Sequence, residues 1–114
     1  MRLTDDARMA TWLRQLSGAA SDFDWDAGNR AKHRKHGVQP ADIEAMFRGR
    51  TVFVGRIVQP EHNEDRWLLL GKDLGGRPLA LIFTRRGDQL RPISCRPMRA
   101  NERKVYEQAC QETQ

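Results

Sequence analysis

Two apolar runs joined by a glycine turn decide the fold of this chain: residues 66–85 read RWLLLGKDLGGRPLALIFTR. Arg66 to Gly71 and Leu79 to Arg85 are compact and apolar, and the intervening Gly75-Gly76 is typical of a turn. A connection this short joins antiparallel strands, because a parallel pair needs a long crossover. The pattern therefore predicts a β-hairpin at the centre of a sheet.

One further strand is predicted on each side of this hairpin. Thr51 to Val58 is rich in β-branched residues, and Leu90 to Arg96 follows a Gly87-Asp88 turn. Pro92 cannot donate to a hydrogen-bond ladder, so the last strand is expected to lie at a sheet edge or to carry a bulge. We expect an antiparallel four-stranded meander.

Helices are predicted on both sides of the strands in the sequence. Residues 3–17 repeat apolar side chains at helical spacing, with Thr4 as a cap. The other predicted helices are a basic one over Asp26–His36, ended by Gly37, a short one over Ala41–Phe47 after Pro40, and a last one from Asn101 to about Gln111. This order predicts an α+β fold, with helices packed on one face of the sheet. We divide it into an N-terminal helical extension, 1–21, and a main domain, 22–114.

Composition limits the classes of protein that the chain can form. Its 114 residues are 39% hydrophobic and 31% charged, which suits a small core with charged edges. No apolar run approaches the roughly 20 residues of a membrane span, and the N-terminus lacks the apolar region of a secretory signal. Cys95 and Cys110 are expected to be free thiols. We expect a soluble cytoplasmic protein.

The net charge is concentrated in one segment. Residues 85–104 hold seven basic and two acidic residues, a net charge of +5, and the whole chain is also +5. Six of the seven are arginine, whose planar fork suits phosphate oxygens. A solvated basic face would show the same composition, but a phosphate-rich partner, nucleic acid first, is the functional interpretation. In a regular strand Arg91 and Arg96 would lie on opposite faces, unless a bulge at Pro92 shifts the register.

His62 is the main candidate for acid–base chemistry. It lies in the loop between the first two predicted strands, with Glu64 and Arg66 close by in the sequence. A ribonuclease without a metal must activate a ribose 2′-OH, stabilise a crowded phosphate and protonate a leaving oxygen. His62, Glu64, Arg66, Arg96 and Tyr106 are suitable residue types; the alternative for His62 is a solvated loop histidine. His33 and His36 lie three apart with no third ligand nearby, so we expect no metal and no cofactor.

Several motifs, taken in order, resemble the BrnT toxin family. They are Phe23-Asp24-Trp25-Asp26, Lys35-His36-Gly37-Val38, His62 with Arg66, and Ile93-Ser94-Cys95-Arg96 followed by Glu102-Arg103 and Tyr106. The chain departs from the family pattern at His33, Pro92 and Cys95. The resemblance implies a RelE-like fold and a ribonuclease toxin of a type II toxin–antitoxin pair. It also implies a BrnA-like, DNA-binding antitoxin that forms a hetero-oligomer with the toxin.

The leading hypothesis is a metal-independent endoribonuclease that cleaves mRNA by transesterification and arrests growth. The expected catalytic residues are His62, Arg66, Arg96, Tyr106 and His36. The residues expected to hold the RNA backbone are Lys35, Arg85, Arg91, Arg99 and Arg103. The alternative function is a non-catalytic basic module that docks an acidic partner or represses transcription together with a DNA-binding antitoxin.

Overall fold

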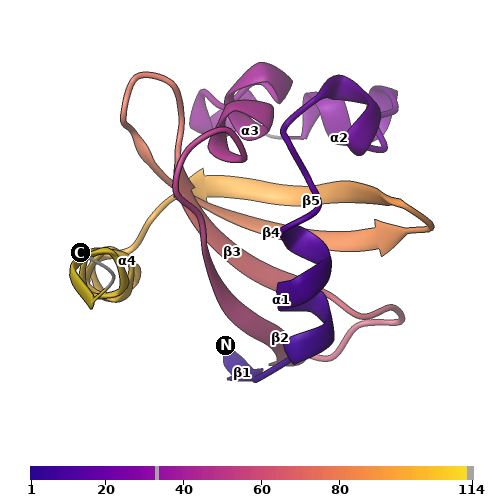
Figure 1. Cartoon of the computed structure of the whole chain (residues 1–114). Helices are drawn as coiled ribbons and strands as arrows, with labels where there is room; N and C mark the ends of the chain where they lie inside the picture. Colours follow the sequence, from indigo (N-terminus) through magenta and orange to yellow (C-terminus); the bar gives the residue numbers. More distant parts are fainter. Residues whose placement is uncertain (33, 113–114) are drawn as a thin grey trace.

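The computed structural model describes residues 1–32 and 34–112 as an α+β domain built on one antiparallel sheet (Figure 1). The sheet order is β1-β2-β3-β4-β5, so strands adjacent in the sequence are adjacent in space. The strands are β1 (Arg2–Thr4), β2 (Val52–Gln59), β3 (Trp67–Lys72), β4 (Pro78–Arg86) and β5 (Gln89–Pro97). The helices are α1 (Ala7–Leu13), α2 (Ala27–Ala31), α3 (Pro40–Met46) and α4 (Ala100–Glu112), with short 3-10 helices η1 (Ala20–Asp22) and η2 (Arg34–His36).

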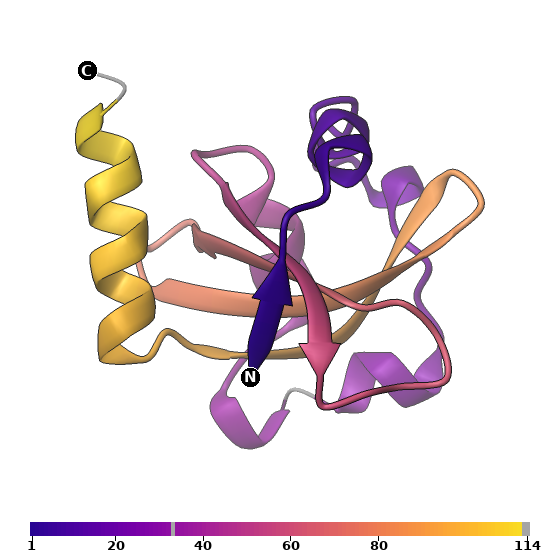
Figure 2. The same cartoon turned by 90° about the horizontal axis from the view of Figure 1, so that it is seen from below.

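The sheet has five strands, so the expectation of four was wrong. The additional strand, β1, pairs with β2 at the sheet edge, with Leu3 opposite Ile57 (Figure 2). The close approach needs a glycine, because a Cβ atom on Gly55 would lie 2.5 Å from the carbonyl oxygen of Thr4. The helix predicted over residues 3–17 is therefore shorter: α1 begins at Ala7 and is capped by Asp6, not by Thr4.

Asp6 also fastens this N-terminal region to the sheet. Its carboxylate accepts a hydrogen bond from the backbone N–H of Met9 at 3.1 Å and another from Nε1 of Trp67 at 2.9 Å. The hydrogen bond from Trp67 is the largest of the effects that hold the pKa of Asp6 below its ordinary value. A single side chain thus caps α1 and binds it to β3.

Helices cover both faces of the sheet, and not one face as expected. On one face α1 and α3 place Trp12, Ile43 and Met46 against the sheet residues Leu81 and Phe83. On the other face Tyr106 of α4 packs with Leu68, Leu70, Ala80 and Met98. Coverage of both faces explains why β3 and β4 read as continuous apolar runs without polar alternation.

The basic helix predicted over Asp26–His36 is divided in two. Asp26 caps α2 as expected, with its side chain accepting from the N–H of Asn29 at 3.0 Å. This helix ends at Ala31, and η2 follows before Gly37, which has a positive φ of 68°. His33 lies outside the described residues.

Pro92 lies in an edge strand and at a bulge, so both of the alternatives expected for it are present. β5 is at the edge of the sheet, and its pairing with β4 slips so that Ile82 faces Ser94 while Phe83 faces Pro92. The extra residue is Ile93. The slip places Arg91 opposite Thr84 and Arg96 opposite Ala80, which brings both arginines onto one face.

Candidate functional site

The β2–β3 loop is fixed to the neighbouring β4 at one end of the sheet. The hydroxyl of Thr84 donates to the carbonyl oxygen of Asp65 at 2.8 Å. Nη2 of Arg86 donates to Oε2 of Glu64 at 3.1 Å. These contacts join the loop that carries His62 to the strand that leads into the β4–β5 turn, so two segments of the predicted site meet here.

A cavity of about 630 Å³ opens beside this loop. It lies between the loop and strands β1 and β2, and the side chains that give it charge are Arg2, Arg56, Glu61, His62, Glu64 and Asp65. His62 itself is exposed. Three of these side chains are carboxylates, and Nη1 of Arg56 lies 4.0 Å from Oδ1 of Asp65. The two guanidinium groups are of a type that binds phosphate, and histidine is a common acid–base residue.

Arg66 adjoins the loop at the start of β3. It is half-buried, and among the buried side-chain nitrogen and oxygen atoms of the described residues its Nε has no hydrogen-bond partner. Burying an unpaired donor costs stability. A bound water molecule, an ion or a ligand would each supply the missing acceptor.

Arg96, which was expected to serve in one catalytic site with His62, lies at the opposite end of the sheet from the His62 loop. It faces Ala80, which faces Leu70, four residues along β3 from Arg66. The two arginine backbones are thus separated by about 13 Å along the strands and about 10 Å across them. The reason is the meander itself, because the β2–β3 and β4–β5 connections share one end of the sheet and β5 runs away from it.

The guanidinium of Arg96 is bound by Glu102. Its Nη1 and Nη2 lie 2.7 and 3.0 Å from the two carboxylate oxygens, and the side chains of Arg96 and Glu102 are only 16% and 10% exposed. Burial alone would raise the pKa of Glu102, but the hydrogen bonds from Arg96 and from the N–H of Arg99 hold it below the ordinary value. Residue spacing does not single out Glu102 as the partner of Arg96. Its position three residues after Arg99 is nevertheless typical of a carboxylate at the start of a helix.

Lys35 and His36 lie at the end of the sheet that holds Arg96 and not at the end that holds His62. Both are exposed in η2, which packs against β5. The backbone oxygen of His36 accepts from Nη1 of Arg77 at 3.4 Å, and Arg77 comes from the β3–β4 turn at the same end of the sheet as Arg96. The predicted catalytic set is thereby divided between two ends of the sheet.

Tyr106 joins neither group. It is buried between α4 and the sheet, and its hydroxyl donates to the carbonyl oxygen of Arg50 at 2.9 Å. Burial raises the pKa of Tyr106. With its hydroxyl engaged inside the core, Tyr106 is placed to hold α4 on the sheet.

The residues expected to hold RNA differ in whether other side chains of the protein already contact them. Arg91 donates to Asp26 at 2.9 Å and to Asp24 at 3.4 Å, and burial opposes the rise in its pKa that these carboxylates cause. Arg85 stacks over Trp12, 4.3 Å from the ring centroid. The remaining three, Lys35, Arg99 and Arg103, are exposed. The bulge places Arg91 and Arg96 on one face, but each is held by its own carboxylates.

Two other kinds of chemical group were searched for in the described part of the chain: clusters of metal ligands and a reactive thiol at Cys95. No cluster of three or more His, Cys, Asp or Glu side chains suited to a metal occurs among residues 1–32 and 34–112, and His33 falls outside them. Burial raises the pKa of the Cys95 thiol to about 12, so it stays protonated and is a poor nucleophile. No helix in these ranges is long and apolar enough to cross a membrane.

The fold and the His62 cavity define a small basic α+β protein whose exposed imidazole and guanidinium groups suit phosphate chemistry. A family model described as the ribonuclease toxin BrnT of type II toxin–antitoxin systems matches residues 25–102. The match covers more than half of the chain, and the chain belongs to this family. A type II toxin family implies a cognate antitoxin partner. No curated protein sequence matches the chain.

Proposed function

We propose that this chain is the toxin of a type II pair that cleaves mRNA in the cytoplasm without a metal and thereby arrests growth. Its antitoxin neutralises it by binding. The observation that carries the proposal is the cavity at the β2–β3 loop, which His62 lines together with Arg2, Arg56 and three carboxylates; Arg66 follows this loop in the sequence. Family membership supports the ribonuclease activity in general.

The proposed reaction is an internal transesterification. Neutral His62 accepts the proton of a ribose 2′-OH, and the 2′ oxygen attacks the adjacent phosphorus. The bond from phosphorus to the 5′ oxygen breaks, which leaves a cyclic phosphate on one fragment and a hydroxyl on the other. The departing oxygen takes its proton from solvent, to which the loop is open. The guanidinium group of Arg66, which follows the loop in the sequence, donates to a phosphate oxygen as negative charge develops.

We propose that the Arg96 end binds RNA and takes no part in bond cleavage. Arg96 is already paired with Glu102, whereas Lys35, Arg99 and Arg103 are exposed near the same end. An extended RNA strand carries a phosphate at every nucleotide and can contact both ends of the molecule at once. In this proposal His36 contributes to RNA binding, and Tyr106 supports α4.

The non-catalytic module remains the second candidate function. It is favoured by the acidic partners that already occupy Arg91 and Arg96, because these pairs reduce the charge available to RNA. The two functions differ in whether RNA is cut.

The test is cleavage of a labelled RNA by the purified chain in the presence of a chelator. A metal-independent enzyme yields fragments that end in a cyclic phosphate, and binding weakens steeply with salt as arginine–phosphate contacts release counterions. Salt-sensitive binding without cleavage would support the docking module. Activity that disappears in chelator and returns with a divalent ion would overturn the mechanism.

A further inference from the structure

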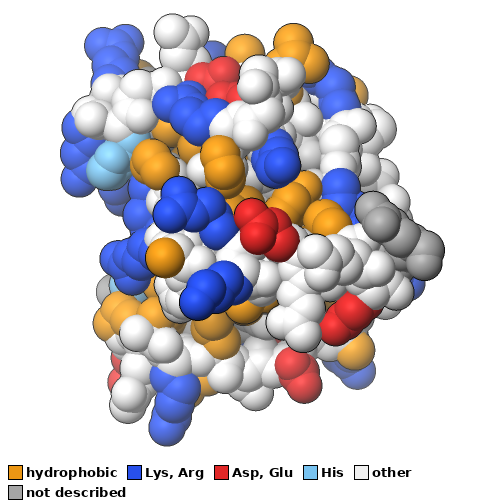
Figure 3. Space-filling model, turned by 90° about the vertical axis from the view of Figure 1, so that its left-hand side faces the viewer, with side chains coloured by type: hydrophobic (Ala, Val, Ile, Leu, Met, Phe, Trp, Pro, Cys, Tyr) orange, Lys and Arg blue, Asp and Glu red, His pale blue; other side chains and the backbone are white. Residues whose placement is uncertain are grey.

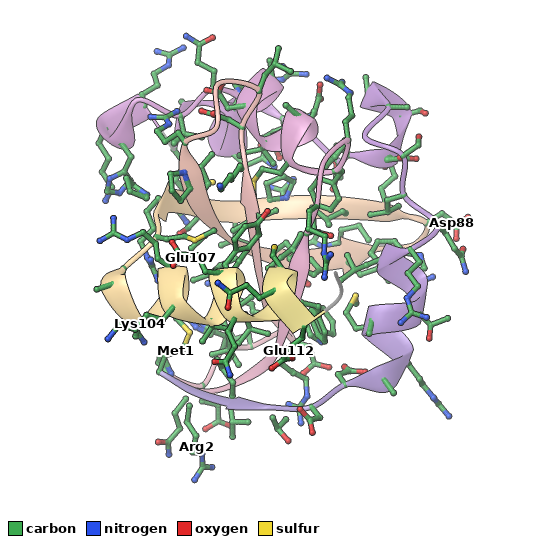
Figure 4. All side chains as sticks on the ribbon, turned by 60° about the vertical axis from the view of Figure 1, so that its left-hand side comes forward. Met1, Arg2, Asp88, Lys104, Glu107 and Glu112 are labelled. Carbon is green, nitrogen blue, oxygen red and sulfur yellow. The ribbon has the colours of Figure 1, made fainter. Side chains whose placement is uncertain are left out.

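A second, apolar groove lies on the α4 side of the sheet, apart from the His62 loop. Its volume is about 240 Å³, and it runs between α4 and strands β1, β2 and β3. The apolar side chains that line it are Met1, Leu3, Val54, Leu68, Leu70 and Val105. Figure 4 labels Met1 and Lys104, which belong to the N-terminal segment and to α4, two of the parts of the chain that border the groove.

Exposed apolar side chains concentrate at this groove. Of the large hydrophobic residues that stand exposed in the described part of the chain, Met1 (54%) and Val105 (45%) both line it. The third, Leu74 at 91%, is in the β3–β4 turn and does not line the groove. Figure 3, which views the molecule from the α4 side, shows apolar side chains among basic ones on this face. Exposed apolar surface with a polar rim is typical of a protein-binding site.

The charged residues around the groove indicate which kind of partner it can bind. Among residues 1–32 and 34–112, the only carboxylate that lines the groove is that of Glu102, and both of its oxygens are bound to Arg96. Arg99, which also lines it, is exposed at the start of the 13-residue helix α4, where the helix dipole adds positive potential. Lys104, near the start of α4, is exposed as well. The charge left for a partner at this end is therefore positive.

We propose that this groove docks a segment of the cognate antitoxin that carries aliphatic side chains followed by a carboxylate. The aliphatic groups fill the groove between Val105 and Leu3, and the carboxylate meets Arg99. The proposal rests on the proposed function only in assuming that the chain has an antitoxin. It places the anchor of that partner on α4 and β1, so that the bound chain also covers Arg99 and the adjacent RNA-binding end.

The test measures binding of the protein encoded by the gene adjacent to this toxin gene, by calorimetric titration of the full-length chain. Val105→Asp introduces a charge that repels a carboxylate and is poorly solvated against the apolar groove, and we expect the Kd to rise at least tenfold. Leu74→Asp is the matched control, because it removes an exposed apolar side chain outside the groove; its Kd should equal that of the wild type. Arg99→Glu, measured for binding only, should weaken the complex as well.

Growth assays separate this proposal from the proposed function. Val105→Asp should arrest growth like the wild type but should no longer be rescued by co-expressed antitoxin. If the wild-type chain neither arrests growth nor cuts RNA, the proposed function fails while the titration still reports on the groove. Equal Kd values for Val105→Asp and Leu74→Asp, in variants with wild-type melting temperatures, would overturn the groove. So would a wild-type dimer that Val105→Asp converts to a monomer, because a second copy would then occupy it.

Discussion

Glu102 holds Arg96 with both carboxylate oxygens, at 2.7 and 3.0 Å, and one of these oxygens also accepts the backbone N–H of Arg99 at 2.8 Å. The pair joins the end of β5 to the first turn of α4. Both side chains are largely buried, so each neutralises a charge that would otherwise be costly inside the protein.

Removing either partner should therefore destabilise the fold. Arg96→Ala and Glu102→Ala each leave one buried charge unpaired, and we expect each to lower the free energy of unfolding by about 3 kcal/mol. Urea unfolding measures the change, and Glu107→Ala, an exposed residue of the same helix, is the control. A wild-type midpoint for Arg96→Ala would show that the ion pair contributes little.

Acid should weaken this junction. The pKa of Glu102 is lowered in the folded protein, so its stabilising contribution is complete above the ordinary glutamate value of 4.5 and is lost as the pH falls through the folded-state pKa. Glu102→Gln removes that contribution at every pH. We expect its unfolding free energy to depend less on pH below 4.5 than that of the wild type, in urea titrations at successive pH values. Parallel curves for the two proteins would contradict the lowered pKa.

His62→Ala should stop cleavage without unfolding the protein. The imidazole is exposed, so the melting temperature should stay within error, whereas loss of a general base costs about a hundredfold or more in rate. The informative comparison is His36→Ala, whose side chain is exposed at the opposite end of the sheet. That variant should raise the RNA concentration needed for half-maximal rate but leave the rate at saturation unchanged. If His36→Ala alone abolishes the saturated rate, the site has been placed at the wrong end.

Arg66→Met should separate activity from stability. The substitution deletes a buried Nε that has no partner among the described residues and keeps an unbranched apolar side chain in its place. Since an unpaired buried donor costs about 1–3 kcal/mol, the unfolding free energy should stay the same or rise. Cleavage should fall sharply because the phosphate loses its donor. A variant that is less stable and still fully active would mean that Arg66 is a structural residue.

Asp6→Ala tests the attachment of the N-terminal region. The change removes the helix cap and the acceptor for Trp67, which together should lower the free energy of unfolding by about 2 kcal/mol. The indole fluorescence of Trp67 should change at the same time. Asp5→Ala is the matched control, because Asp5 precedes it and is exposed. If both variants unfold like the wild type, β1 and α1 are only loosely held.

Strands that are strongly apolar, or that are bounded by clear turn residues, can be predicted from the sequence. β3 and β4 were predicted because their residues are buried from both sides, and Pro92 indicated both the edge and the bulge of β5. Arg2–Thr4 carries no such signal, because three residues become a strand only through pairing with β2, far along the chain. Loop position and residue type make His62 and Arg66 candidates for the site. They could not show that β5 carries Arg96 away from them, or that Glu102 occupies its guanidinium, because both depend on the tertiary arrangement.

The pairing of β1 with β2 also sets a condition on folding. The two strands are separated in the sequence by α1, α2 and α3. Closing so long a loop carries an entropic cost, which the contacts between β1 and β2 must offset. While β1 is unpaired, the outer edge of β2 is open, and another polypeptide strand can add to the sheet at the same place.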